Sequence, residues 1–263
     1  MDKSKRILYQ FPLSLYCEKT RWNLDAKGLN YTCRDLLPGP HAFMAWRLAR
    51  QRCLPILCDE RQTVGDSTTI ALYLEHHYPE SPLLPNDPIV RQQVLKLEEE
   101  FDTLGDHVRR FCWSMVVDSP EVSDIFFGFT GYTRWQQILA AYSRPLLRLM
   151  IRRTFKVYEP RISDSWLYIQ NALQQIEQLL QGRADRYLVG DHFTLADLTA
   201  ASMLAPLIGP NNSPWSDHRI PQVAQQQRAE LRARLVGQWV WRLYHDHRSH
   251  PHDTPHRVTQ EQL

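Results

Sequence analysis

The chain has 263 residues, enough for two modest domains whose buried cores need neither disulfides nor metals to hold them together. Hydrophobic residues make up 43% and charged residues 23%, usage typical of globular rather than disordered or membrane proteins, and the net charge of +2 gives no reason to expect a nucleic-acid partner. No apolar run approaches the roughly 20 residues that span a bilayer, and no signal-peptide core is visible, so we expect a cytoplasmic protein. The five scattered cysteines predict reduced thiols and no metal site.

The first 80 residues predict an alternation of strands and helices. Short apolar runs bounded by turns indicate strands at residues 6–11, 31–37, 55–59 and 63–64. Longer stretches indicate helices at residues 17–27, 42–51 and 67–78, and Gly28 stands where the first of them would end. The resulting order, βαβαββα, predicts a four-stranded α/β domain.

Beyond residue 80 the apolar pattern changes to that of helices. Four prolines between residues 79 and 88 predict a linker, which we place at residues 81–89. Apolar residues then recur at spacings of three and four, as in Trp166, Ile169, Leu173, Ile176 and Leu180. Similar faces at residues 90–116, 195–207 and 223–244 predict an all-helical domain over residues 90–248.

The end of the chain is polar and rich in proline and histidine, so residues 249–263 are expected to form a disordered tail. Five histidines lie in or just before this tail, and their spacing does not define the geometry of a metal site. They are His245, His247, His250, His252 and His256.

The first candidate site is the stretch Ser14-Leu-Tyr-Cys17, where the first predicted strand gives way to a helix. A helix amino-terminus offers unpaired N–H groups and the positive end of the helix dipole, so it stabilises an anion such as a thiolate. Ser14 can add a hydroxyl hydrogen bond to that anion, or it can simply cap the helix. Cys17 is either a reactive thiol or a small buried hydrophobic residue.

Two more candidates follow along the chain. Leu54-Pro55 directly precedes an apolar strand, and we predict that this bond is cis. A cis bond would turn the backbone groups of Leu54 outward, where an extended peptide can pair with them. At the start of the third helix, Ser67 is the expected N-cap and Asp66 stands beside it. Such a helix end suits a carboxylate, and Asp66 can accept from an ammonium group. Each piece alone is better explained as local structure than as a binding site.

Taken together, these pieces resemble the amino-terminal domain of cytosolic glutathione transferases. The resemblance rests on the order Ser14-x-x-Cys17 through Gly28, then Leu54-Pro55, then Asp66-Ser67. In the second half, Thr194 and Asp197 stand three apart like the family's buried capping box, and Phe193 and Leu198 can form its hydrophobic staple. Two departures leave the subclass open, because Leu15 replaces a frequent proline and Asp66 replaces the usual glutamate.

The resemblance implies an α/β thioredoxin-like domain at residues 1–80 followed by an all-α helical bundle domain, in a homodimer with glutathione as co-substrate. It implies that the catalytic residue is Ser14, with Cys17 as the alternative. The residues implied to bind glutathione are Ser14, Leu54, Pro55, Asp66, Ser67 and His41. The residues expected to line the pocket for a small electrophilic or apolar second substrate are Tyr16, Arg109, Phe111 and Trp113.

Three functions fit this pattern. In the leading hypothesis, Ser14 stabilises the glutathione thiolate, which attacks an electrophile held by the helical domain. In the second, Cys17 forms a mixed disulfide with glutathione, so that the protein is a thiol-disulfide oxidoreductase. In the third, the same fold is a non-catalytic carrier of an apolar ligand.

Residues 118–163 make the helical domain longer than the family usually has, and residues 134–161 within them are strongly basic. Arg144, Arg148 and Arg152 stand four apart around several apolar residues, which predicts a basic amphipathic helix. Such a helix can contact an anionic membrane surface. We expect a solvated or domain-packing face instead, because its apolar runs are short.

Overall fold

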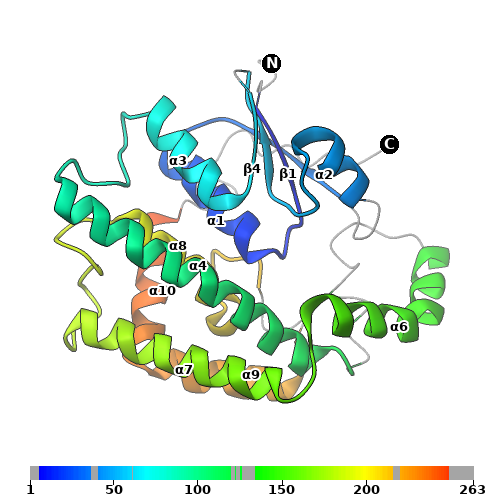
Figure 1. Cartoon of the computed structure of the whole chain (residues 1–263). Helices are drawn as coiled ribbons and strands as arrows, with labels where there is room; N and C mark the ends of the chain where they lie inside the picture. Colours follow the sequence, from blue (N-terminus) through cyan, green and yellow to red (C-terminus); the bar gives the residue numbers. More distant parts are fainter. Residues whose placement is uncertain are drawn as a thin grey trace.

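The computed structural model describes residues 6–36, 41–60, 62–119, 122, 125, 134–215 and 220–248, with only the backbone path for residues 134–143. A small sheet with three helices stands above a larger group of helices, and α1 lies between the two layers (Figure 1). Histidines 250, 252 and 256 of the predicted tail fall outside the described residues. His245 and His247 belong instead to the last helix.

The amino-terminal domain has the predicted βαβαββα order. Its strands are β1 (Ile7–Gln10), β2 (Thr32–Asp35), β3 (Ile56–Cys58) and β4 (Thr63–Gly65), and its helices are α1 (Leu15–Ala26), α2 (His41–Ala49) and α3 (Ser67–His77). The sheet order is β2-β1-β3-β4, with β2 parallel to β1 and the other two pairs antiparallel. The thioredoxin-like fold class is therefore confirmed.

Alternation along the strands gives this sheet two buried faces. Leu8 and Leu57 pack with Ile70 of α3 on one face. Tyr9 and Ile56, one residue along, pack on the other face with residues that include Ala45 of α2. Because α2 covers one face and α3 the other, the two central strands, β1 and β3, are largely apolar on both faces.

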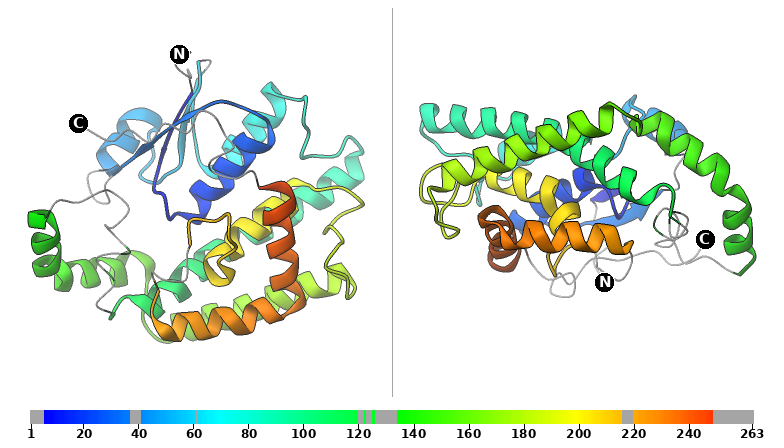
Figure 2. Two further views of the ribbon diagram at one scale, coloured as in Figure 1. Left: turned by 180° about the vertical axis from the view of Figure 1, so that it is seen from behind. Right: turned by 90° about the horizontal axis from the view of Figure 1, so that it is seen from below.

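The second domain is all helical, as predicted. Its helices are α4 (Pro88–Val116), α6 (Arg134–Phe155), α7 (Arg161–Leu180), α8 (Leu195–Ile208), α9 (Gln222–Ala233) and α10 (Leu235–His247). Nearly every residue of α8 is buried, which makes it the central helix of the bundle. The views from behind and below show α6 projecting away from the other helices (Figure 2).

The helical face predicted over residues 223–244 belongs to two helices, α9 and α10. Arg234 between α9 and α10 has extended backbone angles, φ −73° and ψ 158°. At Gly237, a Cβ atom would lie 2.1 Å from the carbonyl oxygen of Leu231. Only glycine therefore lets the first turn of α10 approach the end of α9 so closely.

The predicted capping box at the start of α8 is confirmed. The Asp197 carboxylate accepts from the Thr194 backbone N–H at 2.9 Å and from its hydroxyl at 2.8 Å, and also from the N–H of Leu188 at 2.8 Å. Burial raises the pKa of Asp197 to about 6 despite these bonds. The cap thus fixes the loop before α8 as well as the helix itself.

The segment predicted as a linker is packed between the domains. Leu83 and Leu84 are buried, and their N–H groups donate to the Glu75 carboxylate at 3.0 and 3.2 Å. The carbonyl oxygen of Leu83 accepts from the N–H of Leu195 at 2.9 Å. These bonds tie α3, the connection and α8 into one unit.

Charged side chains on α1 are buried between the domains, contrary to the usual exposure of such residues. Lys19 is fully buried and pairs with Glu98 and, at 2.6 Å, with Asp102, both on α4. Its Nζ also donates to the hydroxyl of Thr68 at 2.9 Å. This group of residues joins α1, α3 and α4.

A second buried group joins α1 to the residue that follows α10. Arg248 donates to Glu18 at 2.8 Å and also pairs with Asp25. Arg21 pairs with the same Glu18 at 2.6 Å and donates to the Pro12 carbonyl at 3.0 Å. The view from behind shows the end of α10 close to α1 (Figure 2). The two ends of the fold are thus linked by buried ion pairs.

The basic helix α6 packs partly against the rest of the domain. Leu147 and Ile151 are buried, and Arg152 pairs with Asp118 at 2.5 Å. Arg148 donates to the carbonyl of Asp118 at 3.0 Å. Two of the three predicted arginines, Arg148 and Arg152, therefore contact the segment that follows α4.

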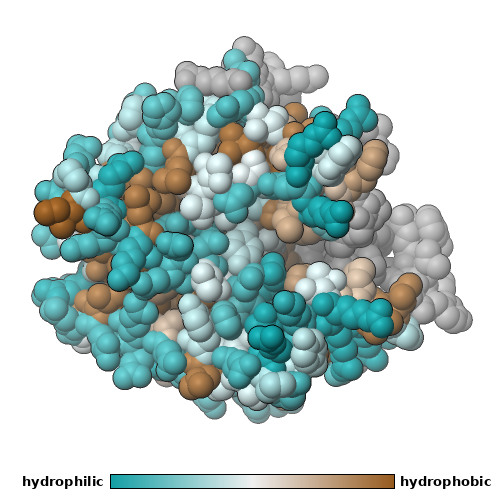
Figure 3. All heavy atoms as spheres, viewed as in Figure 1, coloured by the Kyte–Doolittle hydropathy of each residue, from teal (hydrophilic) through white to brown (hydrophobic). Residues whose placement is uncertain are grey.

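The face seen in Figure 3 is mostly hydrophilic, with apolar residues in small separate groups. In the part of the chain that the structure describes, no helix is both long enough and apolar enough to cross a bilayer.

Candidate functional site

The strand registers bring the three sequence candidates to one edge of the sheet. They align the carboxyl end of β1, the amino end of β3 and the carboxyl end of β4. Ser14 follows β1, Leu54-Pro55 precedes β3, and Asp66-Ser67 follows β4. The sheet thus brings residues that are more than 50 positions apart in sequence to the same edge.

Ser14 is the N-cap of α1, with extended backbone angles of φ −82° and ψ 125°. Helix α1 begins at Leu15, not at the predicted Cys17, since Ser14 already supplies a cap. The Ser14 hydroxyl oxygen accepts from the N–H of Cys17 at 3.4 Å, which is long for such a bond. The half-buried hydroxyl therefore lies beside the first-turn N–H groups, where a ligand anion gains from both.

Cys17 lies in the first turn of α1 and is fully buried. It packs against Tyr9, Ala45 and Ile56 in the core beneath α2. Burial raises the pKa of the Cys17 thiol, while Arg21 acts in the opposite direction. A buried and protonated thiol is a poor nucleophile, so the surroundings of Cys17 favour the packing interpretation.

The Leu54-Pro55 bond is cis, which confirms the prediction. The ladder between β1 and β3 begins only at Ile56, so the backbone of Leu54 lies outside it. Gln51 supports this loop by donating to the carbonyls of Cys53 at 2.8 Å and Pro55 at 3.1 Å. The loop is held in place at the sheet edge where an extended peptide would pair.

Asp66, and not Ser67, is the N-cap of α3, so the predicted cap was one residue too late. The Asp66 carboxylate accepts from the N–H of Thr69 at 2.9 Å and from its hydroxyl at 3.1 Å. Asp66 has φ 68° and ψ 134°, angles that residues with a side chain rarely adopt. Such outliers often occur at ligand sites, because the surrounding structure must hold them there. Ser67 is buried directly behind it.

His41 opens α2, and its ring lies edge-on to Phe11 with the ring centroids 4.8 Å apart. Phe11 follows β1, which brings His41 to the same edge of the sheet as Ser14.

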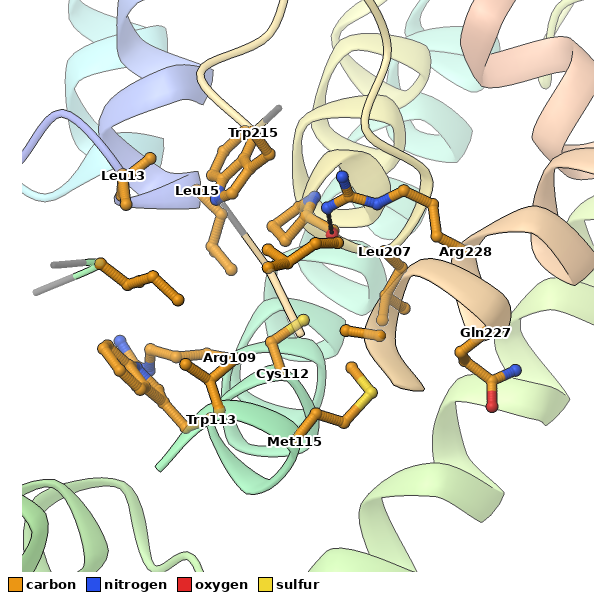
Figure 4. Close-up of a pocket in the computed structure, with 15 residues that line it drawn as sticks. Leu13, Leu15, Arg109, Cys112, Trp113, Met115, Leu207, Trp215, Gln227 and Arg228 are labelled. Atoms are coloured by element: carbon orange, nitrogen blue, oxygen red, sulfur yellow. Dashed lines mark hydrogen bonds between the residues drawn. The ribbon is translucent and has the colours of Figure 1, made fainter. Parts of the chain in front are cut away.

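A largely apolar cleft lies between the two domains (Figure 4). Leu13 and Leu15, the neighbours of Ser14 in sequence, line one side of it. Helix α4 supplies Cys112, Trp113 and Met115, and the opposite side includes residues of α8, the loop after it and α9. The cleft encloses about 110 Å³ and is partly open to solvent.

The structure places two of the four predicted pocket residues in this cleft. Arg109 and Trp113 line it. Phe111 stacks on Trp166 of α7 with ring centroids 4.4 Å apart, and thus faces the bundle. The Tyr16 hydroxyl donates to Asp106 at 2.9 Å, and burial raises the pKa of this phenol, so Tyr16 acts as an interdomain contact.

Several residues that line the cleft were not predicted from the sequence. Leu13 and Leu15 flank Ser14, and Trp215 lies in the loop after α8. A large aromatic residue in a proline-rich loop was a signal that could have marked Trp215. Arg228 of α9 is 3% exposed and lines the cleft. The sequence of this segment predicted only an apolar helix face and gave no sign of a buried arginine. Among the described residues, no cluster of His, Cys, Asp and Glu could hold a metal ion.

Two family models match the chain: "Glutathione S-transferase, N-terminal domain" over residues 8–82 and "Glutathione S-transferase, C-terminal domain" over residues 167–232. A curated relative, glutathione S-transferase 1 of Dianthus caryophyllus, is 27% identical over 79% of this chain and 80% of its own. A probable maleylacetoacetate isomerase of Caenorhabditis elegans is 24% identical over 79% of each chain.

Among solved structures, a glutathione S-transferase of Methylobacterium radiotolerans in complex with glutathione sulfonate aligns with a TM-score of 0.56. It is 22% identical, and the alignment covers 98% of each chain. At this identity the likeness supports the fold alone. The fold, the two family matches and the curated relatives agree that this chain belongs to the glutathione S-transferase family.

Proposed function

We propose that this protein binds glutathione at the edge of its thioredoxin-like sheet and stabilises the glutathione thiolate with Ser14. The thiolate sulfur then forms a bond to an electrophilic carbon of an apolar molecule held in the cleft. In a substitution the leaving group departs with its bonding electron pair, and the thiol proton goes to solvent. The observation that carries the proposal is the place of Ser14, a helix cap whose two sequence neighbours both line the cleft.

The glutathione peptide fits the other residues at this edge. The backbone of Leu54, which lies outside the ladder between β1 and β3 and beside the cis-Pro55, would pair with the cysteinyl residue. The amino end of α3, with Ser67, would bind the γ-glutamyl carboxylate, and Asp66 would accept from its ammonium group. His41, beside Phe11, would contact the remaining end of the tripeptide. By analogy with the family, we also infer a cytoplasmic homodimer.

Calorimetry tests glutathione binding with a matched pair of variants. Asp66→Asn keeps a side chain that can cap α3 but removes the negative charge, so glutathione affinity should fall about tenfold. Asp87 also caps a helix, α4, by accepting backbone N–H groups, but it lies at the linker. Asp87→Asn should therefore leave affinity unchanged. No measurable binding of millimolar glutathione to the unaltered protein would contradict the proposal.

Kinetics with a chloronitrobenzene acceptor tests the role of Ser14. Loss of one charge-assisted hydrogen bond in Ser14→Ala should lower the conjugation rate roughly ten- to a hundredfold and raise the pKa of bound glutathione. Cys17→Ala should leave the conjugation rate close to that of the unaltered protein, because its thiol is buried in the core.

The opposite pattern would favour the oxidoreductase alternative, with conjugation intact in Ser14→Ala and disulfide exchange lost in Cys17→Ala. If neither variant changes any glutathione-dependent rate, the carrier alternative gains support. The cleft would then bind its ligand without catalysis.

A further inference from the structure

The charges lining the cleft are all positive. Its lining contains two guanidinium groups, Arg109 and Arg228, and no carboxylate among the described residues. The other lining residues are mostly Leu, Val, Ile, Met and Trp, so the field of the two cations is weakly screened inside the cleft. Such a lining favours an anionic group over a neutral or cationic one.

Arg228 is the more buried of the two. It is 3% exposed, and its guanidinium donates to the carbonyl of Pro206 at 2.7 Å. Figure 4 shows its side chain reaching from α9 along the cleft toward Trp215. The arrangement places a cation with planar donor geometry at the end of an apolar space, which suits a carboxylate.

Arg109 stands on another wall, nearer to solvent. It pairs with Asp106 at 2.6 Å and lies over the ring of Phe155, with 4.8 Å between the guanidinium carbon and the ring centroid. Because Asp106 neutralises part of the charge of Arg109, Arg109 would attract an anion to the cleft rather than hold it there.

Arg228 could have a purely structural role, in which it caps the end of α8, rather than a role in ligand binding. The nearby Arg232 allows these two roles to be separated. Arg232 caps the same helix end, donating to the carbonyls of Ile208 at 2.6 Å and Gly209 at 2.8 Å. Arg232 does not line the cleft, and its guanidinium lies over Trp241 instead. Of the two capping arginines, only Arg228 is in a position to meet a ligand.

We propose that the second substrate is an apolar electrophile that carries a carboxylate at the end remote from its reacting carbon. The carboxylate binds Arg228, and the apolar body lies against Trp113 and Trp215. The reacting carbon then lies on the side lined by Leu13 and Leu15, the sequence neighbours of Ser14, both of which are labelled in Figure 4. The assignment of the reacting end rests on the proposed function, whereas binding of the carboxylate does not.

The test compares an acid with its neutral amide, biphenyl-4-ylacetate and biphenyl-4-ylacetamide, by calorimetry at pH 7 without glutathione. Both have the same apolar body, so a difference in affinity reports the charge. The unaltered protein should bind the acid ten- to a hundredfold more tightly than the amide, as expected for a charge-assisted hydrogen bond. Equal affinities would overturn the inference.

Variants assign the preference to a residue. Arg228→Met should abolish the preference for the acid, and Arg228→Lys, which keeps a cation without the planar fork, should retain part of it. Arg232→Met should keep the full preference, although it disturbs the same helix end. A loss of preference in Arg232→Met equal to that in Arg228→Met would refute a direct role for Arg228.

Omission of glutathione separates the two proposals. A protein that prefers the acid but fails to bind glutathione would retain the anion site and lose the proposed function. If Arg228→Met does not fold, comparison of acid and amide binding to the unaltered protein and to Arg228→Lys still tests the inference.

Discussion

Replacement of Arg248 by methionine tests the ion pairs that join the end of the fold to α1. The Arg248 side chain is 2% exposed and lies between Glu18 and Asp25, whose side chains are 0% and 4% exposed. Burial alone would lower the pKa of Arg248, but the two carboxylates raise it, so the guanidinium stays charged. The variant would leave two buried carboxylates with fewer partners.

Removal of one member of a buried ion pair costs about 3 to 5 kcal/mol. The lower end applies here, because Arg21 still pairs with Glu18 at 2.6 Å and the Tyr31 hydroxyl still donates to Asp25 at 2.9 Å. We therefore expect the free energy of unfolding to fall by about 3 kcal/mol, or the Tm by roughly 6 to 12 °C.

Urea unfolding followed by tryptophan fluorescence measures this loss, since Trp22 contacts Tyr244 and donates to the carbonyl of His247 at 3.0 Å. The control is Arg183→Gln, which breaks an exposed pair with Asp185 and should leave the midpoint unchanged. Addition of Asp25→Asn to the Arg248→Met variant should recover part of the loss, because it removes one orphaned charge. A change below about 1 kcal/mol in Arg248→Met would refute the reasoning.

Three further outcomes are expected. Asp197→Ala should lower the free energy of unfolding by at least about 2 kcal/mol in urea titrations, because it removes a cap and leaves buried N–H groups unpaired. Burial lowers the pKa of His247, whose Nε2 lies 2.9 Å from the Tyr187 hydroxyl, so the neutral ring contributes stability at pH 7 that is lost as pH falls below about 6.5. The free energy of unfolding should change less between pH 7 and 5.5 in His247→Gln than in the unaltered protein, and an equal change would contradict the prediction. A thiol reagent should modify exposed Cys53 in the folded protein, while Cys17 should react only on unfolding; mass spectrometry of the labelled peptides distinguishes them.

Local signals in the sequence were sufficient for most of the elements. The capping box at Thr194 and Asp197 and the cis bond before Pro55 follow from residues that are adjacent or three apart, and both are present. The break between α9 and α10 was missed because the apolar face continues across Arg234. Neither a proline nor a conspicuous loop composition marks that position.

The cleft and the buried charges depended on contacts between distant parts of the chain. Lys19 and Glu98 are both buried, yet each alone is a residue type expected at the surface. Their pairing becomes apparent only when α1 is packed against α4. The position of Arg228 also could not be predicted locally, because its helix looks ordinary in sequence and only the folded structure shows that it lines the cleft.

The buried charges on α1 also constrain the order in which the chain can fold during synthesis. The thioredoxin-like domain leaves the ribosome first, but the partners of Lys19 lie about 80 residues later and Arg248 lies 230 residues after Glu18. Until these partners have been made, the charged side chains of α1 keep their hydration, and its interdomain face stays exposed. The first domain to be synthesised is therefore among the last to reach its final state, and a nascent chain stalled within α9 would still lack Arg248, the partner of Glu18 and Asp25.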